Sequence, residues 1–145
     1  EDRVGLISFA DRSHLRVPLM RMEEGRGQLT REVEALEAGG NTALLDGVLD
    51  ALEHLEGLND TERINAIVVM TDGQENASKI SLEELLNRLE AAHRSNLRVV
   101  VFCVAYGRTA DIKTLEAISN AAGGFTSTSE PETIRTLYKT LSTYF

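Results

Sequence analysis

The stretch that decides the fold of this chain is Ile67-Val68-Val69-Met70-Thr71-Asp72-Gly73-Gln74-Glu75-Asn76. Its first half is apolar and rich in β-branched residues, which is typical of a strand that a parallel sheet buries on both faces. The strand is predicted to end at Asp72-Gly73, and in open α/β sheets ligands bind at that edge. Asp72 is therefore a candidate site residue, although an Asx turn with Gly73 explains the same pair equally well.

Strands and helices are predicted to alternate along the rest of the chain. A short turn makes the first two strands an antiparallel hairpin, and Pro18 places the second at a sheet edge, with Leu15, Val17 and Leu19 on its buried face. The order predicts an α/β domain with a doubly wound, mostly parallel sheet that helices cover on both faces. Strands are expected at 4–9, 15–19, 64–71, 98–105 and 125–128, and helices at 28–38, 44–55, 82–92, 112–122 and 131–145.

Composition excludes several classes of function. The 145 residues fit a single domain, 1–145, and their net charge of −8 argues against nucleic acid or an anionic membrane as partner. No apolar run reaches the ~18 residues of a membrane span. The single cysteine, Cys103, lies in an apolar run and is expected to be buried and inert. Because the chain opens with Glu1-Asp2 and not with Met, we expect a piece of a longer polypeptide.

Four segments together resemble the von Willebrand factor type A domain: Asp2–Phe9, Gly39–Leu44, Val68–Gly73 and Gly123–Phe125. The resemblance implies a Rossmann-like sheet with a metal-ion-dependent adhesion site at its top. At that site a divalent cation, usually Mg²⁺, binds an acidic residue of a protein partner. The stretch 131–145 is similar to bacterial members in which such a domain follows an extracellular solute-binding-like domain. A location outside the cytoplasm or in the cell envelope is therefore expected.

The family's three cation-binding loops are only partly present. Thr42 matches the second loop and Asp72 the third, but the Asp-x-Ser-x-Ser of the first loop does not occur. The chain begins where the family's second strand begins, so a central strand and its helix, roughly 30 residues, are missing. Two oxygen ligands fall short of the six that Mg²⁺ prefers. We predict that this truncated chain binds Mg²⁺ weakly or not at all, whereas the complete domain binds it.

Neighbouring residues are given supporting roles by hypothesis. Asp46 either supports the site or complements the dipole of its helix, and the second role is favoured. Glu75 either faces a partner or is a solvated loop residue, and Gly40 either lets the backbone approach the ion or stops a helix. Thr42 itself either binds the cation or caps the helix that follows it. The residues expected to support the site or face a partner are Gly40, Asn41, Asp46, Gly73 and Glu75.

Loss of the central strand leaves two apolar strand edges, along 4–9 and 64–71, without partners. We expect these strands either to pair directly or to mediate self-association, in preference to a monomer with a gap in its sheet.

The function predicted from these residues is a non-enzymatic protein-interaction or adhesion module. The alternative is a metal-dependent hydrolase or phosphotransferase that uses Asp72. Gln74 stands where such enzymes usually need a second acid, and neither nucleotide-binding motifs nor Gly-x-Ser-x-Gly are present. A third hypothesis is a structural domain whose site is inactive.

Overall fold

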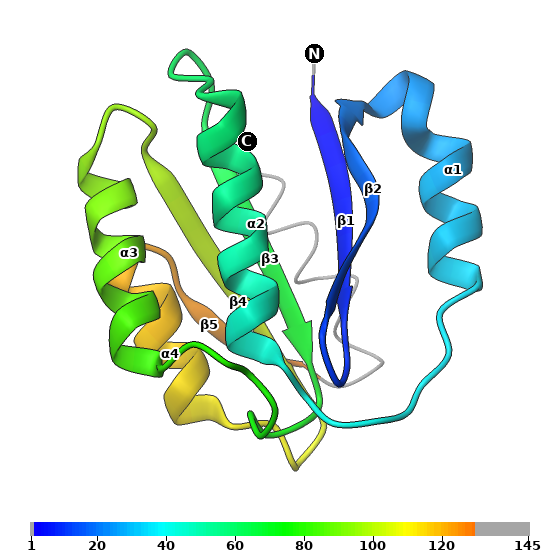
Figure 1. The fold of residues 1–145 in the computed structure, drawn as a ribbon, viewed down its shortest axis with the longest axis vertical. Coiled ribbons are helices and arrows are strands. Elements are labelled where there is room, and N and C mark those ends of the chain that lie inside the picture. Colours follow the sequence, from blue (N-terminus) through cyan, green and yellow to red (C-terminus); the bar gives the residue numbers. More distant parts are fainter. Residues whose placement is uncertain (1, 130–145) are drawn as a thin grey trace.

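The computed structural model describes residues 2–129, so the helix predicted at 131–145 lies outside the described residues. Strands and helices alternate as predicted, which confirms the α/β class (Figure 1). The strands are β1 (Arg3–Phe9), β2 (Ser13–Arg21), β3 (Asn65–Thr71), β4 (Val99–Tyr106) and β5 (Thr126–Ser129), and the helices are α1 (Met22–Glu34), α2 (Leu44–Leu58), α3 (Leu82–Arg94) and α4 (Ile112–Ala121).

The strands form two sheets. β1 and β2 make an antiparallel hairpin, while β3, β4 and β5 make a parallel sheet in that order. The expected direct pairing of 4–9 with 64–71 is therefore wrong: within residues 2–129, β1 pairs only with β2, and β3 pairs only with β4. α2 packs against β1, β2 and β3, so this helix holds the two sheets together (Figure 1).

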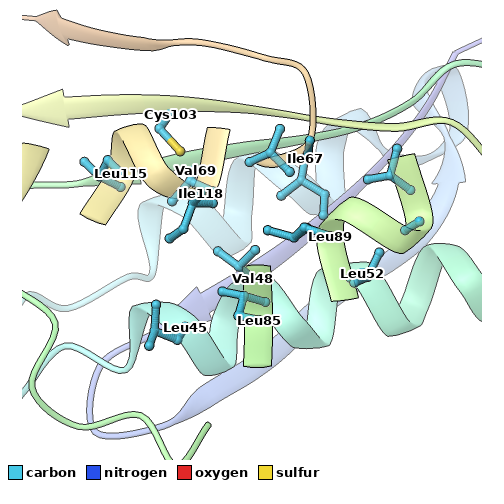
Figure 2. Packing of buried hydrophobic residues seen from close by; sticks show 14 of the residues in the cluster. Leu45, Val48, Leu52, Ile67, Val69, Leu85, Leu89, Cys103, Leu115 and Ile118 are labelled. Atoms are coloured by element: carbon cyan, nitrogen blue, oxygen red, sulfur yellow. The ribbon is translucent and has the colours of Figure 1, made fainter. Parts of the chain in front are cut away.

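The core lies between the parallel sheet and the helices α2, α3 and α4. Figure 2 shows Ile67 and Val69 of β3 in the same cluster as Leu52 of α2 and Leu89 of α3. The opposite face of β3 differs from the prediction, because Val68 is 46% exposed. β3 is an edge strand in this structure, and it is buried on one face only. The adjacent β4 is buried along most of its length, as its sequence predicts.

Two irregularities in the hairpin change which side chains are buried. The register between β1 and β2 shifts between Val4 and Leu6 and again between Leu6 and Ile7. Each shift inserts an extra residue in β2, which breaks the alternation of faces. Leu15 is consequently 52% exposed, against the prediction, whereas Val17 is fully buried. At the first bulge the Leu19 N–H donates to His54 Nε2 of α2 over 3.1 Å.

Helix boundaries follow the sequence signals unevenly. α1 spans Met22–Glu34 and not 28–38. The residue that α1 buries is Gly25, next to Met20, whereas Val33 and Leu36 of the predicted apolar face are 53% and 42% exposed. Two other helix ends carry residues that favour them. The Ser81 hydroxyl accepts from the Glu84 N–H over 3.2 Å, and Asn59 ends α2 in the left-handed conformation.

Cys103 is buried, as predicted, and burial raises the pKa of its thiol to about 12. The native thiol is expected to resist Ellman's reagent at mildly alkaline pH and to react fully in denaturant.

The raised pKa of Cys103 also predicts how the free energy of unfolding changes with pH. Because the pKa in the folded state exceeds the ordinary value of 9.0, the contribution of Cys103 to the free energy of unfolding is constant below pH 9 and is lost as the pH rises toward 12. Wild type should therefore lose stability more steeply than Cys103→Ala across that window in urea unfolding. Equal slopes would contradict this prediction.

Candidate functional site

The candidate site lies where the carboxyl ends of β1 and β3 meet the amino end of α2. The Ala43 N–H donates to the Ala10 carbonyl, just after β1, over 2.7 Å. Thr42 and Asn76 exchange two hydrogen bonds: the Thr42 N–H donates to Asn76 Oδ1 (2.8 Å), and the Asn76 N–H donates to the Thr42 carbonyl (3.1 Å). The loop before α2 is thereby attached to both strand ends, and Thr42 lies beside the loop that carries Asp72.

The Thr42 hydroxyl lies directly against Gly73. A Cβ added to Gly73 would be 2.7 Å from Thr42 Oγ1, which is closer than Cβ atoms in protein structures come to other heavy atoms. Glycine is therefore needed at position 73 for this close approach. The structure thus brings together the two residues predicted to bind a cation, Thr42 and Asp72, from segments far apart in the sequence.

Hydrogen bonds hold the backbone around Asp72, and the residue itself is exposed. The Thr109 hydroxyl donates to the Asp72 carbonyl over 2.5 Å, and the Asp111 N–H donates to the Gly73 carbonyl over 3.4 Å. Within residues 2–129 no hydrogen bond reaches the Asp72 carboxylate or the Thr42 hydroxyl. Both oxygen-bearing groups are therefore available to a ligand. The alternative role of Thr42 as a helix cap is wrong, since Ala43 occupies that position and α2 has no side-chain cap.

The loop after β3 caps α2 in place of a local side chain. Glu75 Oε2 accepts from the Leu45 N–H over 3.0 Å, and Ser78 Oγ accepts from the Asp46 N–H over 3.1 Å. Glu75 Oε1 also accepts from the N–H groups of Ala77 and Ser78. In return, the Asp46 carboxylate accepts from the N–H groups of Lys79 and Ile80. The structure thus places Glu75 and Asp46 in a network that joins this loop to α2.

Asp11, which the sequence shows only as a turn residue, belongs to the same region. Its Oδ1 accepts from the N–H of Asn41 over 2.9 Å and from the Asn41 side-chain amide over 2.8 Å. A Cβ at Gly40 would lie 3.2 Å from the Asp11 carboxylate, and Gly40 has a φ of +81°. Glycine therefore suits position 40 on both grounds. No spacing rule connects Asp11 with a residue thirty positions later, so sequence reasoning had no signal for it.

The donor set fits part of the shell of a hard cation. The Thr42 hydroxyl and the Asp72 carboxylate are hard oxygen ligands of the kind that Mg²⁺ and Ca²⁺ prefer. Among the described residues, no three His, Cys, Asp or Glu side chains come together as a metal-binding group. Nor does any helix within that range have the length and apolar character to cross a membrane.

Comparisons with known proteins give a consistent result. The model of the von Willebrand factor type A domain family matches residues 1–140. An uncharacterized protein of Borreliella burgdorferi is 27% identical over 106 residues, which are 73% of this chain and 29% of that protein. This chain thus spans less than a third of that curated relative.

Two solved structures share the fold. A von Willebrand factor type A structure from Catenulispora acidiphila has a TM-score of 0.80 at 17% identity, covering 96% of this chain and 32% of that one. Proximal thread matrix protein 1 from the mussel byssus, with a zinc-occupied MIDAS motif, has a TM-score of 0.71 at 21% identity, covering 94% and 33%.

Gly73→Ala tests the close approach of Thr42. The added methyl group must displace the Thr42 hydroxyl, so we expect a loss of about 1–3 kcal/mol in the free energy of unfolding, measured with urea. In a Thr42→Ala background the hydroxyl is gone, and the cost of Gly73→Ala should largely disappear. Gly57→Ala is the matched control, because no atom lies within 4 Å of a Cβ there. Equal costs in both backgrounds would contradict the contact.

Proposed function

We propose, from the premise that this chain belongs to the von Willebrand factor type A domain family, that it is a protein-interaction module built around Thr42 and Asp72. Catalysis forms no part of the proposal, since members of this family generally act in binding. In the complete domain these two residues would hold a divalent cation, together with ligands from a third loop. The cation would then bind an acidic residue of a partner protein.

One observation carries this proposal: the Thr42 hydroxyl and the loop of Asp72 lie side by side, and both side chains lack partners among residues 2–129. The Asp72 carboxylate is exposed, so it can exchange bound water for a cation without breaking a bond within the protein. Here the backbone of each loop is fixed by several hydrogen bonds, while the two side chains remain unused. Such an arrangement favours binding of a ligand over a purely structural role.

The nature of the cation follows from the donors. Oxygen ligands favour Mg²⁺, Ca²⁺ or Mn²⁺ over softer metals. The mussel protein with the same fold carries zinc at its MIDAS motif, which supports a divalent cation in general. Location outside the cytoplasm or in the cell envelope remains part of the proposal, and it rests on the resemblance to bacterial members.

Titration with a divalent cation tests the two ligand roles. We expect Mn²⁺ to broaden the amide NMR signals of residues 41–43 and 72–74 in the 145-residue chain, with a dissociation constant in the millimolar range, because one carboxylate and one hydroxyl bind weakly. Asp72→Asn should abolish the effect. Glu83→Gln, which removes an equal charge from exposed α3, should leave it unchanged. Micromolar affinity would show that the donor set is larger than proposed, and unchanged broadening in Asp72→Asn would exclude Asp72.

The unpartnered strand edges suggest a second property of this chain. Within residues 2–129, β1 and β3 do not pair with each other, and a strand from a second molecule can bond the backbone groups along these edges. Ile64, Val68 and Met70 are 62%, 46% and 38% exposed in or beside β3. We therefore propose that two copies associate through these edges.

Light scattering at increasing concentration tests this association. Wild type is expected to form a dimer, and Val68→Lys should shift the equilibrium toward the monomer, because charge on an edge strand opposes pairing. Val33→Lys, at a 53% exposed position of α1, is the control and should leave association unchanged. A wild type that stays monomeric, with fast amide exchange along residues 4–9, would contradict the proposal.

A further inference from the structure

We propose that Asn76 is a positioning residue: its side chain holds the backbone of Thr42 so that the Thr42 hydroxyl lies beside Asp72. This inference rests on the proposed cation site and adds a residue to it. It concerns the separation between the two ligands, which lie in different loops and must reach the same ion.

Three anchors fix the segment that carries Thr42. Asp11 holds Asn41, the Ala10 carbonyl holds Ala43, and Asn76 holds Thr42 itself. The first two anchors come from the end of β1. Within the part of the chain that the structure describes, Asn76 is the anchor that joins Thr42 to the loop of Asp72. Its bonds therefore act directly on Thr42, whereas Glu75 and Ser78 join the same loop to α2 further along, at Leu45 and Asp46.

Asn76 bonds Thr42 at two points, and the points use different groups. The side-chain oxygen accepts from the Thr42 N–H over 2.8 Å, and the Asn76 N–H donates to the Thr42 carbonyl over 3.1 Å. Two hydrogen bonds across one residue restrict rotation of its peptide planes, and so restrict where its Cβ and hydroxyl point. Loss of the side-chain bond frees the Thr42 N–H, so that the Asn76 N–H alone joins Thr42 to the loop of Asp72, while Asn41 and Ala43 stay bonded to the end of β1.

The stability of the fold depends on other contacts of this loop. Asn76 is exposed, so truncation of its side chain leaves no cavity in the core. Glu75 and Ser78 hold the loop on α2 through bonds that do not involve Asn76. A change at position 76 should consequently move the ligands while the domain stays folded. A change at Glu75 should instead remove the cap of α2 and lower stability.

The conservative variant at this position separates positioning from structure. The role of the Asn76 side chain is to accept a hydrogen bond, and an aspartate of nearly the same shape also accepts one. Asn76→Asp should therefore keep Thr42 in place, whereas Asn76→Ala should release it. The Thr42 amide reports this directly, since its hydrogen exchange should accelerate in Asn76→Ala and not in Asn76→Asp.

The test is a Mn²⁺ titration of the 145-residue chain, followed by amide NMR, on wild type, Asn76→Ala and Asn76→Asp. We expect the dissociation constant to rise about tenfold in Asn76→Ala, as is usual when a residue that orients a metal ligand is removed. Asn76→Asp should bind at least as tightly as wild type. Asn96→Ala is the matched control, because Asn96 is exposed at the other end of the sheet, just before β4. The midpoint of thermal unfolding should change little in all of these variants.

The outcomes distinguish this inference from the site on which it rests. If wild type shows no broadening near Thr42 and Gly73, Thr42 and Asp72 do not hold a cation in this chain, and the hydrogen exchange of the Thr42 amide alone decides whether Asn76 positions Thr42. If wild type binds and Asn76→Ala binds equally well, the inference alone is overturned. It is also overturned if Asn76→Ala lowers the unfolding midpoint as far as Glu75→Ala does, or if Asn76→Asp loses affinity as Asn76→Ala does.

Discussion

The amino end of α2 lacks a side-chain cap of its own, and the rest of the site depends on how this deficit is met. The first backbone N–H groups of a helix have no partner within it. Here the loop after β3 supplies Glu75 and Ser78 as acceptors, and the Asp46 carboxylate accepts from N–H groups of that loop in return. The exchange joins the segment after Thr42 to the segment after Asp72.

The sequence predicts elements well where a local pattern determines them. The run of β3 and the Ser81 cap of α3 were predictable because one period or one capping residue is decisive. The start of α1 was not, since α1 buries Gly25 and exposes Val33, which the apolar spacing placed on the buried face. The exposure of Leu15 follows from bulges whose positions no alternation pattern encodes. The family motifs indicated Thr42 and Asp72. The hydrogen bonds that hold their loops join residues more than thirty positions apart, and the sequence gives no signal for such pairs.

α2 also connects the two separate sheets. In a parallel sheet, hydrogen bonds between neighbouring strands normally fix the positions of the strands relative to one another. Between β1 and β3 this connection is replaced by the packing of α2 on both, and by the hydrogen bond from Ala43 to Ala10. Side-chain packing is less directional than a strand ladder. At the site the ends of β1 and β3 are connected through the loop before α2, which bonds to Ala10 after β1 and to Asn76 after β3.

Electrostatics explains why Glu75 and Asp46 lie at the amino end of α2 while Asp72 remains available to a ligand. The amino end of α2 carries a partial positive charge of about half a unit, which opposes a cation nearby. Glu75 bonds directly to the first turn of α2, and Asp46 lies within that turn, so both carboxylates offset this charge. Asp72 takes no part in the compensation, and its exposed carboxylate keeps its charge for a ligand. Without Glu75 and Asp46, Asp72 would have to offset the helix as well as attract an ion. The division of roles among these carboxylates is what makes a cation site beside a helix amino end physically reasonable.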